Sequence, residues 1–395
     1  MSKTEIPSIR FHGFDDAWEQ RKAKELFVST ADKGYPELPV LSATQDRGMI
    51  RRDENSINIF HDKKNEAGYK RVLPGQFVIH LRSFQGGFAH STIEGITSPA
   101  YTVFGFSEPE KHDSEYWKYV FTSESFIQRL ETVTYGIRDG RSISYEEFLT
   151  LGFVYPSKTE QTAIARYLDK LSDLITLHQR KFEKLTNVKK SMLEKMFPRN
   201  GSCYPEIRFK GFTDAWEQRK LGELALFNPK DELPQTFEYV DLESVVGTEM
   251  LSHRTEVKSS APSRAQRLAH TGDLFYQTVR PYQKNNYLYE KPDNNYVFST
   301  GYAQMRPYVD GYFLLSLVQS ERFVKVVLDN CTGTSYPAIN ANDLAEIEVA
   351  ASSDESEAQK IGTIFRSIDN LITLHQCELE KLQSIKKALL EKMFV

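Results

Sequence analysis

The chain has 395 residues, enough for two or three domains, and its 40% hydrophobic and 12% aromatic content is that of a globular protein. A formal net charge of −4 excludes a uniformly basic nucleic-acid-binding surface but leaves room for local basic patches. Cys203, Cys331 and Cys377 have no CxxC or Cys/His metal spacing, which is typical of a reducing compartment. The sequence contains neither a signal-peptide core nor an apolar run of about 20 residues, so we expect a cytoplasmic protein without a membrane span.

Two stretches of the sequence occur twice. An opening segment, IRFHGFDDAWEQRKAKEL at Ile9–Leu26, returns as IRFKGFTDAWEQRKLGEL at Ile207–Leu224. A closing segment, LITLHQRKFEKLTNVKKSMLEKMF at Leu174–Phe197, returns as LITLHQCELEKLQSIKKALLEKMF at Leu371–Phe394. The chain is therefore a tandem duplication, and each half begins with an opener and ends with a closer.

Between these repeated segments, each half combines strand and helix signals in the same order. Short β-branched and aromatic runs bounded by Gly, Pro or Asp predict strands at 38–43, 75–81, 237–246 and 272–279. Apolar residues at helical spacing predict one helix in each half, at 116–133 and 312–329. We therefore expect an α+β protein with tandem α/β domains at 1–154 and 201–350, each followed by a helical segment, at 155–200 and 351–395.

Each closing segment forms the end of a long predicted helix. Apolar residues alternate by three and four along both helices, which is the pattern of a coiled-coil seam. The seam positions are Leu168, Leu171, Ile175, His178, Phe182 and Leu185 in the first helix, and Phe365, Ile368, Ile372, His375, Leu379 and Leu382 in the second. Roughly 38 residues rising 1.5 Å each give a helix of about 57 Å. Packing of each stripe on its own domain is the simpler alternative, but the length and the position-by-position match favour pairing.

Charge favours an antiparallel arrangement of the two helices. The second half of the first helix is basic, and the first turns of the second helix are acidic. Parallel helices would place the lysine pair 189–190 beside the lysine pair 386–387, whereas antiparallel helices avoid this repulsion. We therefore predict an antiparallel coiled coil with pseudo-two-fold symmetry. His178 and His375 would then lie close together, and we interpret them as packing or register residues rather than as ligands or a pH switch.

The sequence shows no catalytic constellation. The nearest match to a phosphate loop, GIRDGRS at Gly136, is one residue short and has Arg141 in place of lysine. No GxGxxG follows a predicted strand, and neither HExxH nor GxSxG is present. The SPAY tetrapeptide at Ser98 lacks one proline of the amino-methyltransferase motif. We therefore expect no catalytic residue, metal or cofactor on this chain.

Basic and polar side chains gather instead on predicted loops at matching places in both halves. Arg and Lys reach guanine edges or phosphates, Asn and Gln pair with adenine, and Ser, Thr and Tyr hold the DNA backbone. The candidate DNA-binding residues are Thr44, Gln45, Arg47, Arg51, Arg52, Arg82, Ser83, Gln85, Arg138 and Arg141 in the first half, and Arg264, Gln266, Arg267, Thr278, Arg280, Tyr282, Lys284, Asn285, Ser335 and Tyr336 in the second. Ordinary solvated loops are the alternative for any single residue. Loops that vary on a repeated scaffold favour two recognition surfaces with different targets.

With opener, variable domain and long helix each present twice, the chain resembles the DNA-specificity subunit of type I restriction–modification systems. The resemblance covers nearly the whole chain and is carried by the IRFxGFxDAWEQRK openers and the LITLHQ…EKMF helices. SAPSRAQR and GDLFYQTVRPY look like one type of recognition domain of that family, and TQDRG with HLRSFQGG like another. Ala23 and Lys24 replace the usual Leu-Gly of the opener, which Leu221 and Gly222 retain, so the turn that follows the opener is expected to differ.

The resemblance implies that each variable domain is a target-recognition domain that reads one half of a split, asymmetric site in double-stranded DNA. The paired helices would set the length of the gap and dock two methyltransferase subunits, which carry the methyl donor site and flip adenine. Two restriction subunits, the motor-nucleases that use ATP and Mg, would join through them for phage defence. This chain would itself be a non-catalytic subunit.

Two other classes of function stay open at this stage. A coiled-coil scaffold could present its two domains to proteins rather than to DNA, and an enzyme could carry an unrecognised site. The negative net charge is in mild disagreement with phosphate binding. If the chain binds DNA, we expect its basic residues to be concentrated on one concave face.

Overall fold

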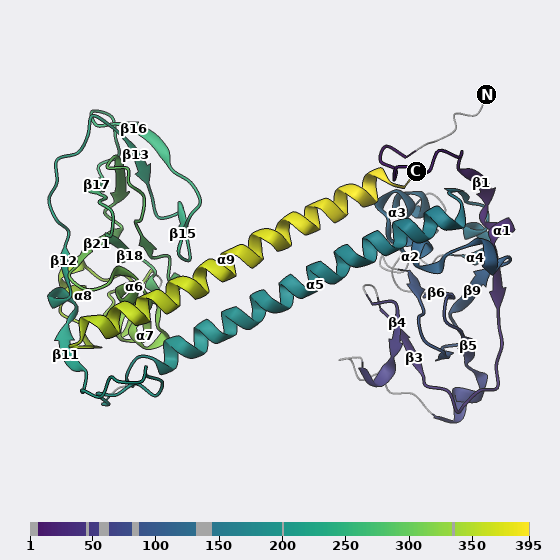
Figure 1. The fold of residues 1–395 in the computed structure, drawn as a ribbon, viewed down its shortest axis with the longest axis horizontal. Coiled ribbons are helices and arrows are strands. Elements are labelled where there is room, and N and C mark those ends of the chain that lie inside the picture. The colour runs from purple at the N-terminus through teal and green to yellow at the C-terminus, as the bar shows by residue number, and fades with distance from the viewer. Residues whose placement is uncertain are drawn as a thin grey trace. The chain divides into compact units, whose positions relative to one another are not determined.

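The chain forms two compact units in a computed structural model that describes residues 7–44, 47–54, 63–80, 87–131, 144–199, 201–333 and 336–394 (Figure 1). Unit 1 comprises residues 1–177 with 378–395, and unit 2 comprises residues 178–377. The long helices α5 (Lys158–Lys195) and α9 (Glu355–Lys392) have 38 residues each, which confirms their predicted length. Each unit thus holds one predicted domain, the first half of its own long helix and the second half of the other one.

Unit 1 is built on a four-stranded antiparallel sheet in the order β2-β9-β6-β7. Its strands are β2 (Phe27–Thr30), β9 (Thr102–Phe106), β6 (Phe77–Ile79) and β7 (Phe88–His90). Three two-stranded pairs surround it: β1 (Glu19–Lys22) with β10 (Gly152–Tyr155), β3 (Leu41–Ala43) with β4 (Met49–Arg51), and β5 (Lys70–Val72) with β8 (Gly95–Thr97).

Unit 2 repeats this central sheet in the order β12-β21-β18-β19. The strands are β12 (Ala225–Phe227), β21 (Tyr302–Pro307), β18 (Leu274–Gln277) and β19 (Tyr287–Leu288). A second four-stranded sheet contains β16 (Arg254–Val257), β13 (Thr236–Val240), β20 (Tyr296–Ser299) and β17 (Ala265–Leu268). The described part of unit 1 has two-stranded pairs instead of a second four-stranded sheet. The remaining pairs are β11 (Glu217–Lys220) with β22 (Glu348–Ala351), and β14 (Val245–Val246) with β15 (Glu249–Met250).

Each single helix predicted in the interiors is in fact two helices, which corrects the sequence-based prediction. Unit 1 has α2 (Ser114–Thr122) and α3 (Glu124–Glu131), and unit 2 has α6 (Gly311–Gln319) and α7 (Glu321–Asp329). Ser123 and Ser320 interrupt them in extended conformation, and their hydroxyls accept a hydrogen bond from the backbone of Phe126 and Phe323 at 3.3 Å. A serine that caps the next helix outweighs continuous apolar spacing. The shorter helices are α1 (Ala23–Leu26), α4 (Tyr145–Phe148) and α8 (Ala341–Ala345).

The predicted strands are all present, although one is divided. The stretches 38–43, 75–81 and 272–279 contain β3, β6 and β18. The stretch 237–246 splits into β13 and β14 because Ser244 turns back onto Asp241, with its hydroxyl donating to the Asp241 carboxylate at 2.9 Å. Cys203, Cys331 and Cys377 are free thiols.

The aromatic core of each unit is completed by the last residues of the other half's closing helix. In unit 1 the ring of Phe394 lies 5.5 Å from that of Tyr116, and in unit 2 the ring of Phe197 lies 5.6 Å from that of Phe313. Tyr116 and Phe313 occupy matching positions of the tandem repeat. Each EKMF copy therefore fills the same aromatic socket, in the unit that does not hold the start of its own helix.

Candidate nucleic-acid interface

The repeated opener fastens each domain to the start of its own long helix. Arg10 pairs with Glu160 at 2.7 Å, and Arg208 pairs with Glu357 at 2.6 Å, both in the first turn of the helix. Both carboxylates are buried. Glu357 also accepts a hydrogen bond from the indole of Trp216 at 2.9 Å. Burial acts to raise the pKa of Glu357, but the hydrogen bonds from Arg208 and its neighbours outweigh it, so the pKa lies below its ordinary value.

The opener also meets the end of the other half's closing helix in the same way in both units. The backbone N–H of Ile9 donates to the carbonyl of Lys392 at 3.1 Å, and that of Ile207 donates to the carbonyl of Lys195 at 2.9 Å. The first contact joins distant parts of the chain, whereas the second spans a short connection. Both satisfy a carbonyl that the helix end leaves without an intrahelical partner.

The turn after the opener differs between the units, as the sequence predicted. Ala23 begins the short α-helix α1, whereas Leu221 begins a 3₁₀ turn over Leu221–Glu223. A side chain at Gly222 would come within 3.3 Å of Ala345, so glycine suits the closer approach in unit 2. In both turns the first residue is fully buried and its N–H donates to the carbonyl of the residue just before the strand that precedes the long helix, Leu151 in unit 1 and Ile347 in unit 2.

Within each unit the segments of α5 and α9 run antiparallel. In unit 2, His178 and His375 face each other with their Nδ1 atoms 3.2 Å apart, and Lys189 lies 2.6 Å from Asp369. Residues further along α5 therefore pair with residues nearer the start of α9. In unit 1, the last turns of α9 pack on the core that holds the first turns of α5. The predicted antiparallel pairing is therefore confirmed.

The predicted seam residues serve two purposes. Leu168 and Leu171 are buried in the main core of unit 1, and Phe365 and Ile368 are buried in unit 2, so the first part of each stripe packs largely on its own domain. The later positions, which include the two histidines, are only partly covered. Packing on the own domain therefore accounts for the start of each stripe, and helix pairing accounts for its later positions.

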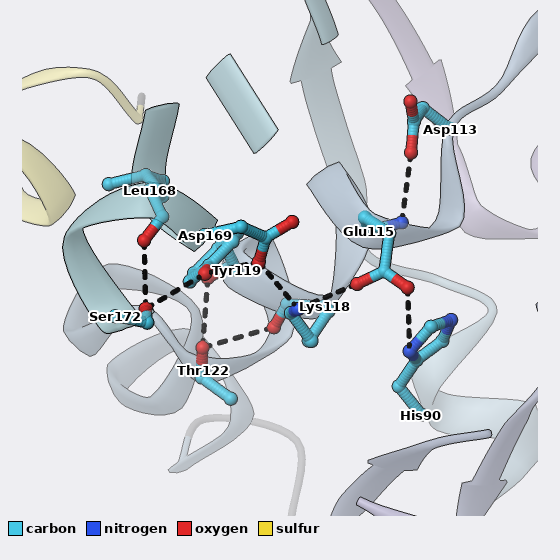
Figure 2. Close-up of polar contacts among 9 residues, drawn as sticks. All are labelled: His90, Asp113, Glu115, Lys118, Tyr119, Thr122, Leu168, Asp169 and Ser172. Carbon is cyan, nitrogen blue, oxygen red and sulfur yellow. Dashed lines mark hydrogen bonds and ion pairs between the residues drawn. The ribbon is translucent and has the colours of Figure 1, made fainter. Parts of the chain in front are cut away.

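A chain of polar contacts in unit 1 connects β7 to α5 (Figure 2). His90 lies 3.8 Å from Glu115, whose other oxygen lies 2.6 Å from Lys118. Lys118 and the hydroxyl of Tyr119 both donate to Asp169 on α5, at 2.9 and 2.7 Å. Burial raises the pKa of Tyr119 to about 12 and lowers that of His90, so at neutral pH the tyrosine is a hydrogen-bond donor. The contacts hold the domain on its own helix.

In unit 2, the segment after β18 presents the predicted residue Arg280 in an unusual conformation. Arg280 has φ 55° and Lys284 has φ 56°, left-handed backbone angles that residues other than glycine rarely adopt. The Arg280 guanidinium lies 4.6 Å from the ring centroid of Tyr336, which is 64% exposed. Tyr282 beside it is 50% exposed. A cation stacked on an exposed aromatic ring forms a ready surface for a nucleotide base or phosphate.

Other predicted residues support this segment from within. Thr278 is buried, and its hydroxyl donates to the carbonyl of Gly301 at 2.8 Å, so it does not lie at the surface. The Asn285 side chain accepts from the N–H of Gly247 at 2.8 Å, and Lys284 lies 2.8 Å from Glu321. The structure thus gives Thr278, Lys284 and Asn285 intramolecular partners.

The β17 strand brings further predicted residues to the same end of unit 2. The carbonyl of Arg264 accepts a hydrogen bond from the N–H of Thr300. The next residue, Gly301, accepts one from the N–H of Thr278, which directly follows β18. Arg264 and Gln266 are exposed, while Arg267 is partly buried. Burial lowers the pKa of the Arg267 guanidinium, and its Nε has no hydrogen-bond partner among the described residues.

Unit 1 places its predicted residues around the turn between β3 and β4. The hydroxyl of Thr44 donates to Gly48 at 2.8 Å and accepts from the N–H of Arg47 at 3.1 Å, which closes the turn. Arg47 and Arg51 are exposed. In the described part of the chain, Nε and Nη1 of Arg52 are buried without a partner. The other predicted residues, Gln45, Arg82, Ser83, Gln85, Arg138, Arg141 and, in unit 2, Ser335, lie outside the described residues.

Sequence reasoning missed the β14–β15 hairpin of unit 2. Val246 at its turn and Leu251 just after it are exposed. The N–H of Gly247 donates to the side chain of Asn285, and Glu249 accepts a hydrogen bond from Thr373 of α9 at 3.0 Å. The hairpin therefore connects the Arg280 segment to the long helix. The signal was present as Val-Val-Gly-Thr-Glu-Met, a short apolar strand pair around a glycine turn.

The described ranges hold no group of three or more His, Cys, Asp or Glu side chains placed to bind a metal ion. Every helix found in them is too short or too polar to cross a membrane.

Comparisons with known proteins found a match only at the level of structure. No protein-family model matches the chain, and no curated protein matches it by sequence. Among solved structures, the chain is similar to the S subunit of a type I restriction-modification system from M. genitalium, with 16% identity, a TM-score of 0.57 and 99% of both chains covered. The fold is that of an S subunit. This likeness confirms the predicted α+β class with its paired long helices.

Two further solved chains were found at lower TM-scores. The HsdS subunit from Thermoanaerobacter tengcongensis has 14% identity and a TM-score of 0.45, over 95% of this chain and 96% of that one. A chain from a study of the assembly and conformational transition of the type I R-M system has 13% identity and a TM-score of 0.49, over 97% and 99%.

Proposed function

We propose that this chain is the sequence-specific DNA-binding subunit of a type I restriction–modification complex. Each target-recognition domain reads one half of a split, asymmetric site, and the chain is itself non-catalytic. The observation that carries the proposal is the contrast within the repeat. The openers, the helix sockets and the central sheets match in both units, while the sequence around Arg280 differs from its counterpart around Ser83.

The Arg280 segment has the chemistry of base readout. A guanidinium donates two parallel hydrogen bonds to the O6 and N7 atoms of guanine, and tyrosines beside it stack on bases or hold phosphates. Hydrogen bonds from Gln277 to Gln283 at 2.9 Å and from Arg280 to Pro337 at 2.8 Å fix the segment from both sides. An arginine held in one conformation loses little entropy when it binds a base edge.

The paired helices set the distance between the half-sites and dock the partner subunits. Two copies of nearly the same helix offer two copies of nearly the same surface, which suits two methyltransferase subunits. These subunits carry the methyl donor site, and two restriction subunits that use ATP and Mg join through them. The absence of a recognised catalytic motif in the sequence agrees with this division of labour.

Selection from a random duplex library tests the DNA-reading role. The purified chain with its cognate methyltransferase subunits is expected to enrich two short motifs separated by a fixed unread gap. A protein-binding scaffold would enrich no split motif, and that result would refute the proposal.

Shortening the helices tests the spacer role separately. Removing two turns from both α5 and α9, at matching positions of the repeat, is expected to change the gap and leave both half-site sequences intact. An unchanged gap after helix shortening would show that the helices do not set it.

A further inference from the structure

Unit 1 has an open cleft between the α2–α3 corner and the last turns of α9. Its volume is about 610 Å³, and its walls include Ser125, Gln128, Ile175, Lys386, Lys387 and Leu390. Ile175 and Leu390 give it an apolar floor beside two lysines. All of these residues belong to unit 1.

The corresponding place in unit 2 is filled by an arginine of the chain itself. Arg322, which matches Ser125 in the tandem repeat, donates to the carbonyls of Phe197 at 3.0 Å and Pro198 at 2.9 Å. It also donates to the carbonyl of Glu194 and lies 3.3 Å from that residue's carboxylate. These groups belong to the end of α5, the counterpart of the end of α9. Serine is too short to make the same contacts in unit 1.

A second difference leaves the cleft of unit 1 with an unpaired lysine. In unit 2, Lys189 lies 2.6 Å from Asp369. The matching residues in unit 1 are Lys386 and the uncharged Ser172. Among the described residues Lys386 forms no ion pair, and its ammonium lies 5.6 Å from the centroid of the Tyr119 ring. Burial, and then the nearby Lys118, lower the pKa of Lys386 and outweigh Asp169, which raises it but is already paired with Lys118, so the charge of Lys386 is only partly compensated inside unit 1.

We propose that this cleft binds a carboxylate side chain of a partner protein, carried on a helix whose apolar residues pack on Ile175 and Leu390. The inference rests on the proposed function, because the partner is taken to be the methyltransferase subunit. The incoming carboxylate replaces the charge that Asp369 supplies in unit 2. Glu391 also lines the cleft and lies 4.0 Å from Lys387, so Lys386 is the lysine of the cleft that is left for the incoming carboxylate.

The two docking places on the chain are then unequal. Unit 2 satisfies its lysine and closes its cleft with its own residues, so a partner gains neither contact there. Unit 1 offers both an apolar cleft and a half-buried cation. One methyltransferase subunit therefore binds unit 1 more tightly than the other binds unit 2, and the complex fills in a fixed order.

The test is a titration of the purified full chain with its cognate methyltransferase subunit, followed by native mass spectrometry and calorimetry. Wild-type protein is expected to bind two copies with unequal affinity. Ser125→Arg fills the cleft as Arg322 does, and Lys386→Gln removes the cation. Each is expected to weaken the tighter site about tenfold or more and leave the weaker site unchanged, because a partly desolvated carboxylate loses its partner. Ser8→Arg, at an exposed serine of unit 1 outside the cleft, is the matched control.

The outcomes separate the inference from the function on which it rests. If wild-type chain binds no methyltransferase subunit, the docking role itself is refuted. If wild type binds two copies but Ser125→Arg and Lys386→Gln bind them equally well, only the cleft inference is overturned. Weakened DNA binding by the Lys386→Gln chain alone, with unchanged methyltransferase affinity, would identify DNA as the occupant and also overturn it. Melting temperatures equal to that of wild type show that each variant is folded.

Discussion

Units 1 and 2 attach their long helices through the same joint, but they lock them with charges of opposite sign. Unit 1 places Asp169 of α5 against Lys118 at 2.9 Å. At the matching position of α9, unit 2 has Arg366, which pairs with Glu290. The same helix position thus carries an anion in one unit and a cation in the other, each held by its own domain.

The difference shows which parts of the duplicated sequence are constrained to remain alike. The opener and the EKMF end of each closing helix contact the other copy's segments, so both copies must fit the same socket. The ion pairs of Asp169 and Arg366 are each formed with a residue of their own domain, so each residue could change together with its partner. The repeat is therefore kept at the opener joint and at the EKMF helix ends, and lost at ion pairs such as these.

The largest expected effect comes from emptying one socket at a time. Phe394→Ala removes an aromatic side chain from unit 1, and Phe197→Ala removes one from unit 2; each is expected to cost about 3–5 kcal/mol of unfolding free energy. Hydrogen exchange should rise mainly around Tyr116 in the first variant and around Phe313 in the second. Faster exchange in the opposite unit would refute the exchange of helix ends between units.

Breaking the buried Arg–Glu pair of the opener is expected to cost nearly as much unfolding free energy, and to cost more in unit 2 than in unit 1. Glu357→Gln leaves Arg208 without its charged partner and should cost about 3 kcal/mol at pH 7. Glu160→Gln should cost less, because Glu160 has no tryptophan donor among the described residues: the indole of Trp18 makes no hydrogen bond there. Denaturant unfolding of both variants measures the difference, and equal losses would contradict it.

The pH dependence of this joint follows from the direction of the pKa shift. The pKa of Glu357 is lowered in the folded chain, so its contribution to stability is present above the ordinary value of 4.5 and is lost as the pH falls through the folded pKa. The stability difference between wild type and Glu357→Gln should therefore shrink below about pH 4.5. A difference that stays constant down to pH 3 would show that the carboxylate charge is not the cause.

The recognition surfaces should be separable by a single substitution. Arg280→Ala is expected to relax the second half-site by about 1–3 kcal/mol and leave the first half-site fully specified. Lys284→Ala, four residues on, is the matched control, since Lys284 is engaged by Glu321 and should change specificity less. Competition binding with single-base variants of both half-sites measures both effects. Equal loss at the two half-sites would refute independent reading by each domain.

The sequence predicted the duplicated architecture because the repeated openers and helix ends mark the start and the end of each half. It also predicted the antiparallel pairing from the sign of the helix charges. It did not predict the helix breaks at Ser123 and Ser320, where a serine side chain competes with continuous apolar spacing. Nor did it distinguish the partly exposed Arg280 from the buried Thr278, because both lie in one polar stretch and only the pairing with Gly301 separates them.

Reversing the charge of Asp169 is expected to cause a smaller loss of unfolding free energy, which a second substitution should restore. Asp169→Arg places two cations together in unit 1 and is expected to cost about 1–2 kcal/mol, because the pair is only partly exposed. Lys118→Glu in the same chain should restore much of the loss, which a double-mutant cycle measures. Arg366→Ala in unit 2 controls for a general weakening of the helices. Losses that simply add in the double variant would show that the two residues do not interact.

The smallest expected effect is at the histidine pair, where the two helix copies meet at matching positions. His375 has a pKa lowered by burial, then by the neighbouring His178 and Lys181. Because the unfolded chain takes up its proton first, the stabilising effect of neutral His375 is present above about pH 6.5 and declines as the pH falls below it. His375→Asn keeps a hydrogen-bonding side chain and should flatten the change in melting temperature between pH 7.5 and 5.5. His270, which lies beside Asp231 in unit 2, gives the control substitution His270→Asn. If His375→Asn leaves the pH dependence unchanged, the pair fixes only helix register and does not respond to protons.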